Sequence, residues 1–239
     1  GSFFQNEALS GAFDYAQEKN SSVHLAGLLT SGTAHADFPH IVALLELARQ
    51  KNCQRTYLHL FLDGKDSGLQ EAPVLLTKLQ VEMKSNGCGK IATLIGRNFA
   101  MDRDNNWDLI RKAYELLVDA KGDVSDDYFK TIQDNYGLGL NDSTMTPIVV
   151  ADSGFGGIKE NDAVIFFNFR EDSMRQILKP FIEENFSLFP ANPPGNVYMA
   201  TMTQYLEDTQ ARVAFMPPVV ANGLAEVLET NGKKQLHIA

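Results

Sequence analysis

Residues 163–170 read AVIFFNFR, an apolar run that ends abruptly at the cation Arg170. A strand with one face in water alternates apolar and polar side chains, whereas a strand covered by helices on both faces is apolar almost throughout. The run therefore predicts a buried central strand in a mostly parallel sheet.

Other apolar runs also end at ionisable residues. They are VHLAGLLTSGTAH at 23–35, TYLHLFLDGKD at 56–66 and KIATLIGR at 90–97. Because ligands of open α/β sheets bind beyond the carboxyl ends of the strands, we expect the terminal side chains along one rim. These side chains are those of His35, Lys65, Asp66, Arg97 and Arg170. Such a rim suits a small molecule with several negative charges.

The rest of the sequence alternates short β-rich runs with longer amphipathic stretches, which is typical of βαβ units. Strands are predicted at 23–29, 55–62, 90–96, 147–151, 163–169 and 197–202. Helices are predicted from Phe38-Pro39 through IVALLELARQKN, and at 71–86, 106–119, 124–136, 172–184 and 218–231, the last capped at Asn231-Gly232. The prolines in FPANPPGN at 189–196 predict a loop or linker. These elements predict a single three-layer α/β/α domain with a mostly parallel central sheet.

The composition limits the kinds of partner. The chain has 239 residues, of which 44% are hydrophobic, and its 30 acidic and 21 basic residues give a net charge of -9. Local cations in an acidic protein indicate a small site and argue against nucleic-acid or membrane binding. Cys53 and Cys88 form no CxxC motif, and no signal peptide or transmembrane run is visible, so we expect a cytoplasmic protein. Gly1-Ser2 resembles an expression scar.

Familiar cofactor motifs are incomplete. Asp102 and Asp104 imitate a calcium loop, but Trp107 and Ala113 stand where glycine and a bidentate acid are required. No HExxH or other complete set of metal ligands is present, and neither a GxSxG elbow nor a Walker loop supplies a nucleophile or phosphate site. We therefore expect no metal site in this chain.

Two further motifs have structural interpretations. The glycines of SGFGGI at 153–158 lie between two β-like runs, which favours a hairpin turn over a dinucleotide-binding loop. His24 and His59 lie inside strand patterns and are expected to be ordinary packed residues.

Longer motifs follow one another along the chain in a characteristic order. They are FFQNEAL, HLAGLLTSGTAH, ALLELA, FLDGKD, GKIATLIGRNFAMDRDNNW, KAYELL, DAVIFFNFREDSMRQ, MTQY, VAF-x-PP and GLAEVLETNGKKQLHIA. In this order they resemble cofactor-independent (2,3-bisphosphoglycerate-independent) phosphoglycerate mutase, and the resemblance runs from Phe3 to Ala239. GRNFAMDRD and FFNFR are long and unusual enough to make chance similarity very improbable.

The resemblance implies one part of a larger enzyme. The family belongs to the alkaline phosphatase superfamily and combines a metal-binding phosphatase domain, with a phosphorylated serine and two Mn²⁺ ions, and an inserted substrate-binding domain. This chain resembles only the insert, at residues 3–239. No cofactor is therefore expected in this chain, and the isolated domain is expected to be inactive. The implied partners are phosphoglycerate and the metal-binding domain of the same polypeptide, in a monomer.

The resemblance also implies roles for individual residues. His35 matches a histidine that contacts substrate, and Asp66 matches an aspartate proposed to move protons on the glycerate hydroxyls, so both are expected to be catalytic. Arg97 and Arg103 match the arginines of GRxxAMDRD, and Arg170 matches the first arginine of NFRxDR, all of which bind substrate carboxylate or phosphate. Guanidinium groups pair bidentately with such anions, which supports these assignments independently.

The sequence departs from the family at several positions. Thr30-Ser31-Gly32-Thr33 replaces SDGG, so an acidic residue is missing, and Lys65 replaces the arginine of DGRD as an expected substrate-binding cation. Ser173 stands where NFRxDR has its second arginine, and Lys65 or Arg175 is a candidate to supply the missing charge.

Structural interpretations of three site residues stay open. Arg103 is compatible with a solvated ion pair at a helix start, Asp66 with a turn residue, and His35 with a residue at the start of a helix.

The leading functional hypothesis is the substrate-binding domain of an enzyme that interconverts 3-phosphoglycerate and 2-phosphoglycerate. The alternatives are a domain of a phosphatase or mutase for another phosphorylated metabolite, and a non-catalytic anion-binding module.

Overall fold

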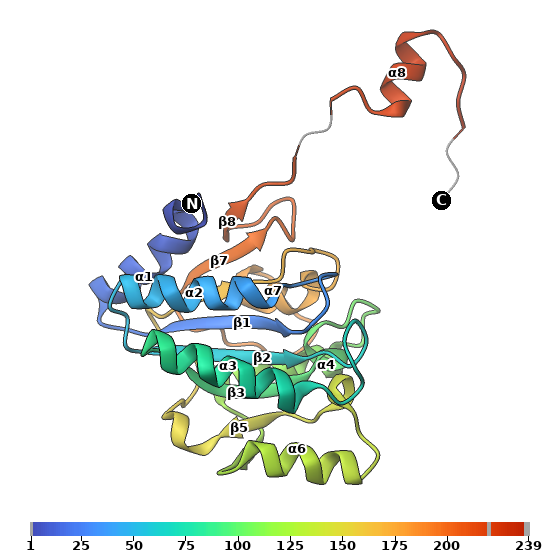
Figure 1. Ribbon diagram of the computed structural model, residues 1–239. Coiled ribbons are helices and arrows are strands. Elements are labelled where there is room, and N and C mark those ends of the chain that lie inside the picture. Colours follow the sequence, from blue (N-terminus) through green and yellow to red (C-terminus); the bar gives the residue numbers. More distant parts are fainter. Residues whose placement is uncertain (1, 219–220, 237–239) are drawn as a thin grey trace.

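The apolar runs form the middle of one eight-stranded sheet in the computed structural model, which describes residues 2–218 and 221–236 (Figure 1). The strands are β1 (Val23–Leu29), β2 (Thr56–Leu62), β3 (Lys90–Gly96), β4 (Asp123–Ser125), β5 (Ile148–Val150), β6 (Ala163–Phe166), β7 (Tyr198–Thr203) and β8 (Arg212–Phe215). Their order is β4-β5-β3-β2-β1-β6-β7-β8. Neighbouring strands are parallel except β3 and β5, which are antiparallel.

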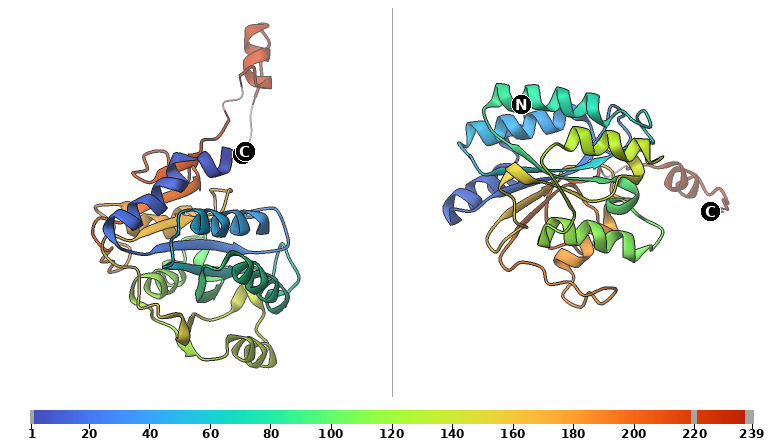
Figure 2. Two further views of the ribbon diagram at one scale, coloured as in Figure 1. Left: turned by 60° about the vertical axis from the view of Figure 1, so that its left-hand side comes forward. Right: turned by 90° about the horizontal axis from the view of Figure 1, so that it is seen from below.

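Helices cover both faces of this sheet (Figures 1 and 2). The helices are α1 (Glu7–Lys19), α2 (Phe38–Gln50), α3 (Ala72–Asn86), α4 (Arg97–Ala100), α5 (Trp107–Asp119), α6 (Tyr128–Gly137), α7 (Arg175–Ile182) and α8 (Leu224–Thr230), with short 3-10 turns at Ser2–Gln5, Asp142–Thr144 and Ala151–Ser153. α1, α2 and α3 lie on one face, and α5 packs beside α7 on the other. The predicted three-layer α/β/α class with a mostly parallel sheet is confirmed.

Most predicted elements are present, with shifted ends. The expected helix at 124–136 is wrong at its start, because β4 occupies Asp123–Ser125 and the Asp127 side chain then caps α6 through the Lys130 N–H. The expected helix at 172–184 is shortened to α7, and α8 is shorter than 218–231, of which residues 219–220 lie outside the described residues. The sequence patterns missed α1, α4, β4 and β8.

The strand predicted at 163–169 ends early, at Phe166, because side chains take over its hydrogen bonds. The buried Asn168 carboxamide accepts the Leu28 N–H at 2.9 Å, and the Tyr205 hydroxyl donates to the carbonyl oxygens of Phe166 and Asn168 at 3.1 and 2.5 Å. The chain therefore leaves the sheet three residues before the predicted end, and Arg170 lies in a loop.

The hairpin expected at 153–158 is wrong. β5 pairs with β3 and β4, whereas β6 pairs with β1 and β7, so the two flanking strands are not neighbours. The segment is instead a crossover at the edge opposite the ends of β1, β2 and β3, where the Ser153 carbonyl accepts a bond from Lys90 at the start of β3. Gly157 has a φ of +92° and lies so close to the Val118 carbonyl that a side chain would clash.

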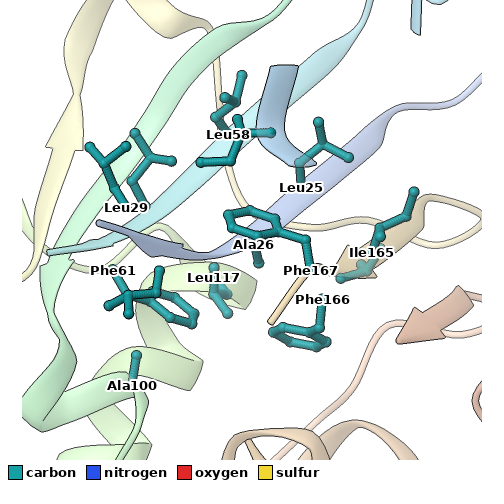
Figure 3. Close-up of a cluster of buried hydrophobic side chains, with 14 of the residues drawn as sticks. Leu25, Ala26, Leu29, Leu58, Phe61, Ala100, Leu117, Ile165, Phe166 and Phe167 are labelled. Carbon is teal, nitrogen blue, oxygen red and sulfur yellow. The ribbon is translucent and has the colours of Figure 1, made fainter. Parts of the chain in front are cut away.

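The central strands are buried on both faces. Figure 3 shows Leu25 and Ala26 of β1 packed near Phe166 and Phe167, with Phe61 of β2 in the same cluster. Every residue of β1 is buried. This burial explains the continuously apolar runs, because neither face of these strands meets water.

His24 and His59 are packed, as predicted, and they also belong to a buried chain of hydrogen bonds, here called the histidine ladder. Asp162 Oδ2 lies 3.0 Å from His24 Nε2, His24 Nδ1 lies 3.0 Å from His59 Nε2, and His59 Nδ1 lies 2.9 Å from the Thr93 hydroxyl. One arrangement of hydrogens satisfies the whole series: the Thr93 hydroxyl donates to His59 Nδ1, His59 Nε2 donates to His24 Nδ1, and His24 Nε2 donates to the Asp162 carboxylate. The ladder joins β3, β2, β1 and the turn before β6.

Acidification is expected to destabilise the fold through His59. Complete burial, together with nearby His24, holds the pKa of His59 well below 6.5. Below about pH 6.5, His59 binds a proton in the unfolded chain but not in the folded chain. The free energy of unfolding is therefore retained above this pH and falls as the pH drops. We expect a contribution of up to about 1.4 kcal/mol per pH unit between about pH 6.5 and pH 5.

Urea denaturation across this range measures the effect. The His59→Gln variant, which has no titratable ring at this position, should show a shallower dependence than the wild type. Equal slopes would show that His59 is not held neutral in the folded protein.

Candidate functional site

A cleft of about 570 Å³ lies beyond the carboxyl ends of the central strands. Chain connections run from β1 toward β2 and β3 on one side and from β6 toward β7 on the other, so the cleft lies at a topological switch point. All of the residues predicted to form the site line it, namely His35, Lys65, Asp66, Arg97, Arg103 and Arg170. The structure thus brings them together, and their binding roles stay predictions.

The floor of the cleft is a buried ion cluster centred on Arg97. One guanidinium nitrogen, Nη1, lies 2.6 Å from Asp63 Oδ1 and 2.6 Å from Asp66 Oδ2. The Asp63 side chain is 0% exposed and also accepts the Thr30 hydroxyl at 2.5 Å. Burial raises the pKa of Asp63, but the Thr30 hydroxyl and Arg97 outweigh burial, so the pKa lies below its usual value. Arg97 is therefore held firmly between two carboxylates.

Asp63 also shapes the loop that carries two predicted site residues. Its Oδ1 accepts the backbone N–H groups of Lys65 and Asp66 at 3.2 and 3.1 Å, and Gly64, between Asp63 and Lys65, has a φ of +63°. The turn-forming aspartate is thus Asp63, which leaves the Asp66 carboxylate at the cleft with its side chain 30% exposed. Sequence reasoning missed Asp63, although its position directly after β2 was a usable signal.

His35 lies between the loops that follow β1 and β6. Its Nδ1 is 3.1 Å from the Ser173 hydroxyl, its carbonyl accepts the Phe169 N–H at 2.8 Å, and its Nε2 is 3.9 Å from Asp66 Oδ2. Burial and nearby Arg97 lower the pKa of His35, against the opposite effect of Asp172 and Asp66. The imidazole is therefore neutral at neutral pH and able to exchange a proton at the cleft.

Two exposed arginines form the outer wall of the cleft and share one carboxylate. Arg103 Nη1 and Arg170 Nη2 lie 2.5 and 3.1 Å from Asp172 Oδ2, and the two arginine side chains are 56% and 49% exposed. Arg103 thus pairs with a distant loop and not with the start of α5. Sequence reasoning missed Asp172, because nothing in a linear pattern shows that residues 103 and 172 meet.

The substituted positions have new partners. Ser173 is buried against His35, and the Ser31 hydroxyl donates to Glu71 at 2.8 Å, so a carboxylate still lies next to the position where the family motif has its acid. Lys65 lines the cleft, whereas Arg175 pairs with Glu171 at 3.3 Å and lines a different hollow. Lys65 is therefore the better placed of the two candidates to supply charge at the site.

Among residues 2–218 and 221–236, no group of three His, Cys, Asp or Glu side chains is placed to hold a metal ion. No helix there is both long enough and apolar enough to cross a membrane.

The fold and the cleft define an α/β domain with a cation-lined cleft at the sheet's switch point, bordered by a histidine and a carboxylate. Residues 1–207 match the family described as BPG-independent PGAM N-terminus (iPGM_N). The chain belongs to this family of N-terminal domains of 2,3-bisphosphoglycerate-independent phosphoglycerate mutases.

Individual relatives agree with this assignment. A 2,3-bisphosphoglycerate-independent phosphoglycerate mutase of Listeria welshimeri is 40% identical over 243 residues, covering 100% of this chain and 48% of the relative. The corresponding Moorella thermoacetica protein is 38% identical, and 47% of it is covered. A crystal structure of Leishmania mexicana phosphoglycerate mutase at low cobalt concentration is 26% identical with a TM-score of 0.84, covering 95% of this chain and 43% of that chain. The chain spans about half the length of the curated relatives that it matches.

Proposed function

We propose that this chain is the substrate-binding domain of a phosphoglycerate mutase that interconverts 3-phosphoglycerate and 2-phosphoglycerate. The observation that carries the proposal is that Arg97, at the start of α4, meets Arg103 and Arg170 in one cleft, together with Lys65. Phosphoglycerate carries a carboxylate and a phosphate, and guanidinium groups bind both well. The reaction is taken from the relatives, which are named 2,3-bisphosphoglycerate-independent phosphoglycerate mutases.

In this proposal the exposure and the ion-pair partners of each residue determine its role. The half-exposed Arg103 and Arg170 bind the charged groups of the substrate, together with Lys65. Arg97, already paired with two carboxylates, fixes the position of Asp66. Asp66 and neutral His35 then move protons on the glycerate hydroxyls while the phosphoryl group resides elsewhere.

The remaining parts of the proposal concern the whole enzyme. The resemblance assigns the phosphorylated serine and two Mn²⁺ ions to an alkaline phosphatase-like domain of the same polypeptide, into which residues 3–239 are inserted. We propose that the enzyme is a cytoplasmic monomer, and that this chain alone folds and binds substrate without turning it over. Turnover of 3-phosphoglycerate by the 239-residue chain would contradict this division of labour.

A second candidate is a mutase or phosphatase for another phosphorylated metabolite. It is favoured by Ser173, which is buried against His35 at the position where the family motif carries a second arginine. A substrate with fewer anionic oxygens needs fewer cations. Comparing kcat/KM of the full-length polypeptide for 3-phosphoglycerate with that for other phosphorylated hydroxy acids decides between the two.

The Arg170→Ala variant tests the site in the full-length polypeptide. We expect kcat/KM for 3-phosphoglycerate to fall about tenfold to one-hundredfold, because a charged hydrogen bond to the substrate contributes about 1.5–3 kcal/mol. The melting temperature should change little, because the Arg170 side chain is 49% exposed and lies in a loop.

Arg175→Ala is the matched control. This arginine lies nearby and is 51% exposed, but it pairs with Glu171 and does not line the cleft. Its loss should leave kcat/KM within about twofold. An unchanged kcat/KM in a well-folded Arg170→Ala variant would rule out contact between Arg170 and the substrate.

A further inference from the structure

Asp172 joins the two arginines that form the outer wall of the cleft. Its two carboxylate oxygens have different partners: Oδ1 accepts the backbone N–H of Ser173 at 2.8 Å, and Oδ2 receives Arg103 at 2.5 Å and Arg170 at 3.1 Å. The bond to the backbone fixes the carboxylate. The second oxygen links two arginines from loops that are far apart in sequence, Arg103 and Arg170.

This link matters because both arginines are otherwise loosely held. Their side chains are 56% and 49% exposed, and each has only Asp172 as an ion-pair partner among residues 2–218 and 221–236. Ordering a long side chain on binding weakens the affinity by about twofold to twelvefold. A carboxylate that orders both before the ligand arrives removes much of this cost. Each guanidinium has five N–H donors, so the Asp172 contact leaves others free for an anion.

We propose that Asp172 is a positioning residue, which sets Arg103 and Arg170 in the geometry that receives an anionic group of the substrate. The inference rests on the proposed function, because it takes phosphoglycerate as the ligand. Asp172 itself does not bind the ligand, because its carboxylate repels the carboxylate and the phosphate of phosphoglycerate.

Positioning and simple electrostatics predict opposite results for Asp172→Asn. If Asp172 acted only through its charge, then its removal would make the cleft more positive and tighten anion binding. If it orders the arginines, then its removal should weaken the binding of 3-phosphoglycerate by about fivefold to 150-fold, because two side chains must then be ordered on binding.

Calorimetric titration of the 239-residue chain with 3-phosphoglycerate measures the difference. Asp104→Asn is the control, because Asp104 lines the same cleft but makes no ion pair among the described residues. That variant should bind as well as the wild type or more tightly. Weaker binding by Asp172→Asn alone supports the proposal. Equal or tighter binding by Asp172→Asn overturns it.

A second measurement keeps the test independent of the ligand. The heteronuclear NOE of the arginine Nε–H groups reports side-chain mobility, and those of Arg103 and Arg170 should fall in Asp172→Asn, with Arg111 unchanged. Arg111 is a suitable reference, since it pairs with Glu115 on α5. If the wild-type chain binds no 3-phosphoglycerate, then the proposed function loses its support. Unchanged mobility of Arg103 and Arg170 would still overturn the positioning role.

Discussion

Replacing Arg97 with methionine is expected to lower the free energy of unfolding by about 3–5 kcal/mol, the usual effect of removing one partner from a buried ion pair. The side chain of Asp63 is 0% exposed and that of Arg97 is 10% exposed, so water cannot replace the lost cation. Methionine keeps most of the aliphatic volume of arginine, so the loss of stability would result from removing the guanidinium charge and not from a cavity. Urea denaturation near neutral pH measures it.

A double variant separates the charge from other effects. In Arg97→Met with Asp63→Asn, no unpaired buried carboxylate remains, so part of the lost stability should return. The introduced carboxamide has a single oxygen, which can accept the loop N–H groups that now bond to Asp63 Oδ1, while its NH2 group faces the Thr30 hydroxyl that now bonds to Oδ2. A loss below about 1 kcal/mol in Arg97→Met would mean that water or a shifted side chain neutralises Asp63.

Replacing Asp162 with alanine is expected to cost about 3–5 kcal/mol, because each buried donor without an acceptor costs about 1–3 kcal/mol. Its carboxylate accepts the backbone N–H groups of Ser22 and Lys159 at 2.9 and 2.7 Å and the His24 ring at 3.0 Å. Its side chain is only 6% exposed. These contacts tie the crossover before β6 to the start of β1, so the variant should lose stability in both regions.

Hydrogen exchange and urea denaturation test this expectation. The Asp152→Ala variant removes an exposed carboxylate from the same crossover and should change stability by less than about 0.5 kcal/mol. Similar losses in the two variants would show that Asp162 contributes only general surface charge. Faster exchange at the Ser22 amide in Asp162→Ala alone would support the structural role.

The sequence predicted the centre of the sheet well because burial imposes a local pattern. β1, β2 and β3 are mostly apolar, and their ends fall within one residue of prediction. Edge strands carry no such pattern: β4 reads DVS, with Val124 exposed. The end of β6 was beyond prediction, because it depends on Asn168 and Tyr205, which are far apart in sequence.

For the cleft, sequence patterns located the cations and Asp66, and missed the other two carboxylates that hold the arginines. His35, Lys65, Asp66, Arg97, Arg103 and Arg170 meet in one cleft because parallel strands deliver their ends to the same edge. Asp63 and Asp172 act across loops, so their roles follow from tertiary contacts and not from local sequence. The same holds for Ser173, whose bond to His35 no spacing rule indicates.

The histidine ladder constrains how this family of sequences can diverge. Thr93, His59, His24 and Asp162 come from four separate stretches of the chain, yet each satisfies the next. A mutation at any one position leaves a buried polar partner without its hydrogen bond, so the folded protein becomes less stable. A lineage that changes only one of the four residues therefore stays destabilised until the others change as well. Relatives should therefore carry the set intact or have exchanged it as a whole for apolar residues. An alignment in which the four positions vary independently would refute this expectation.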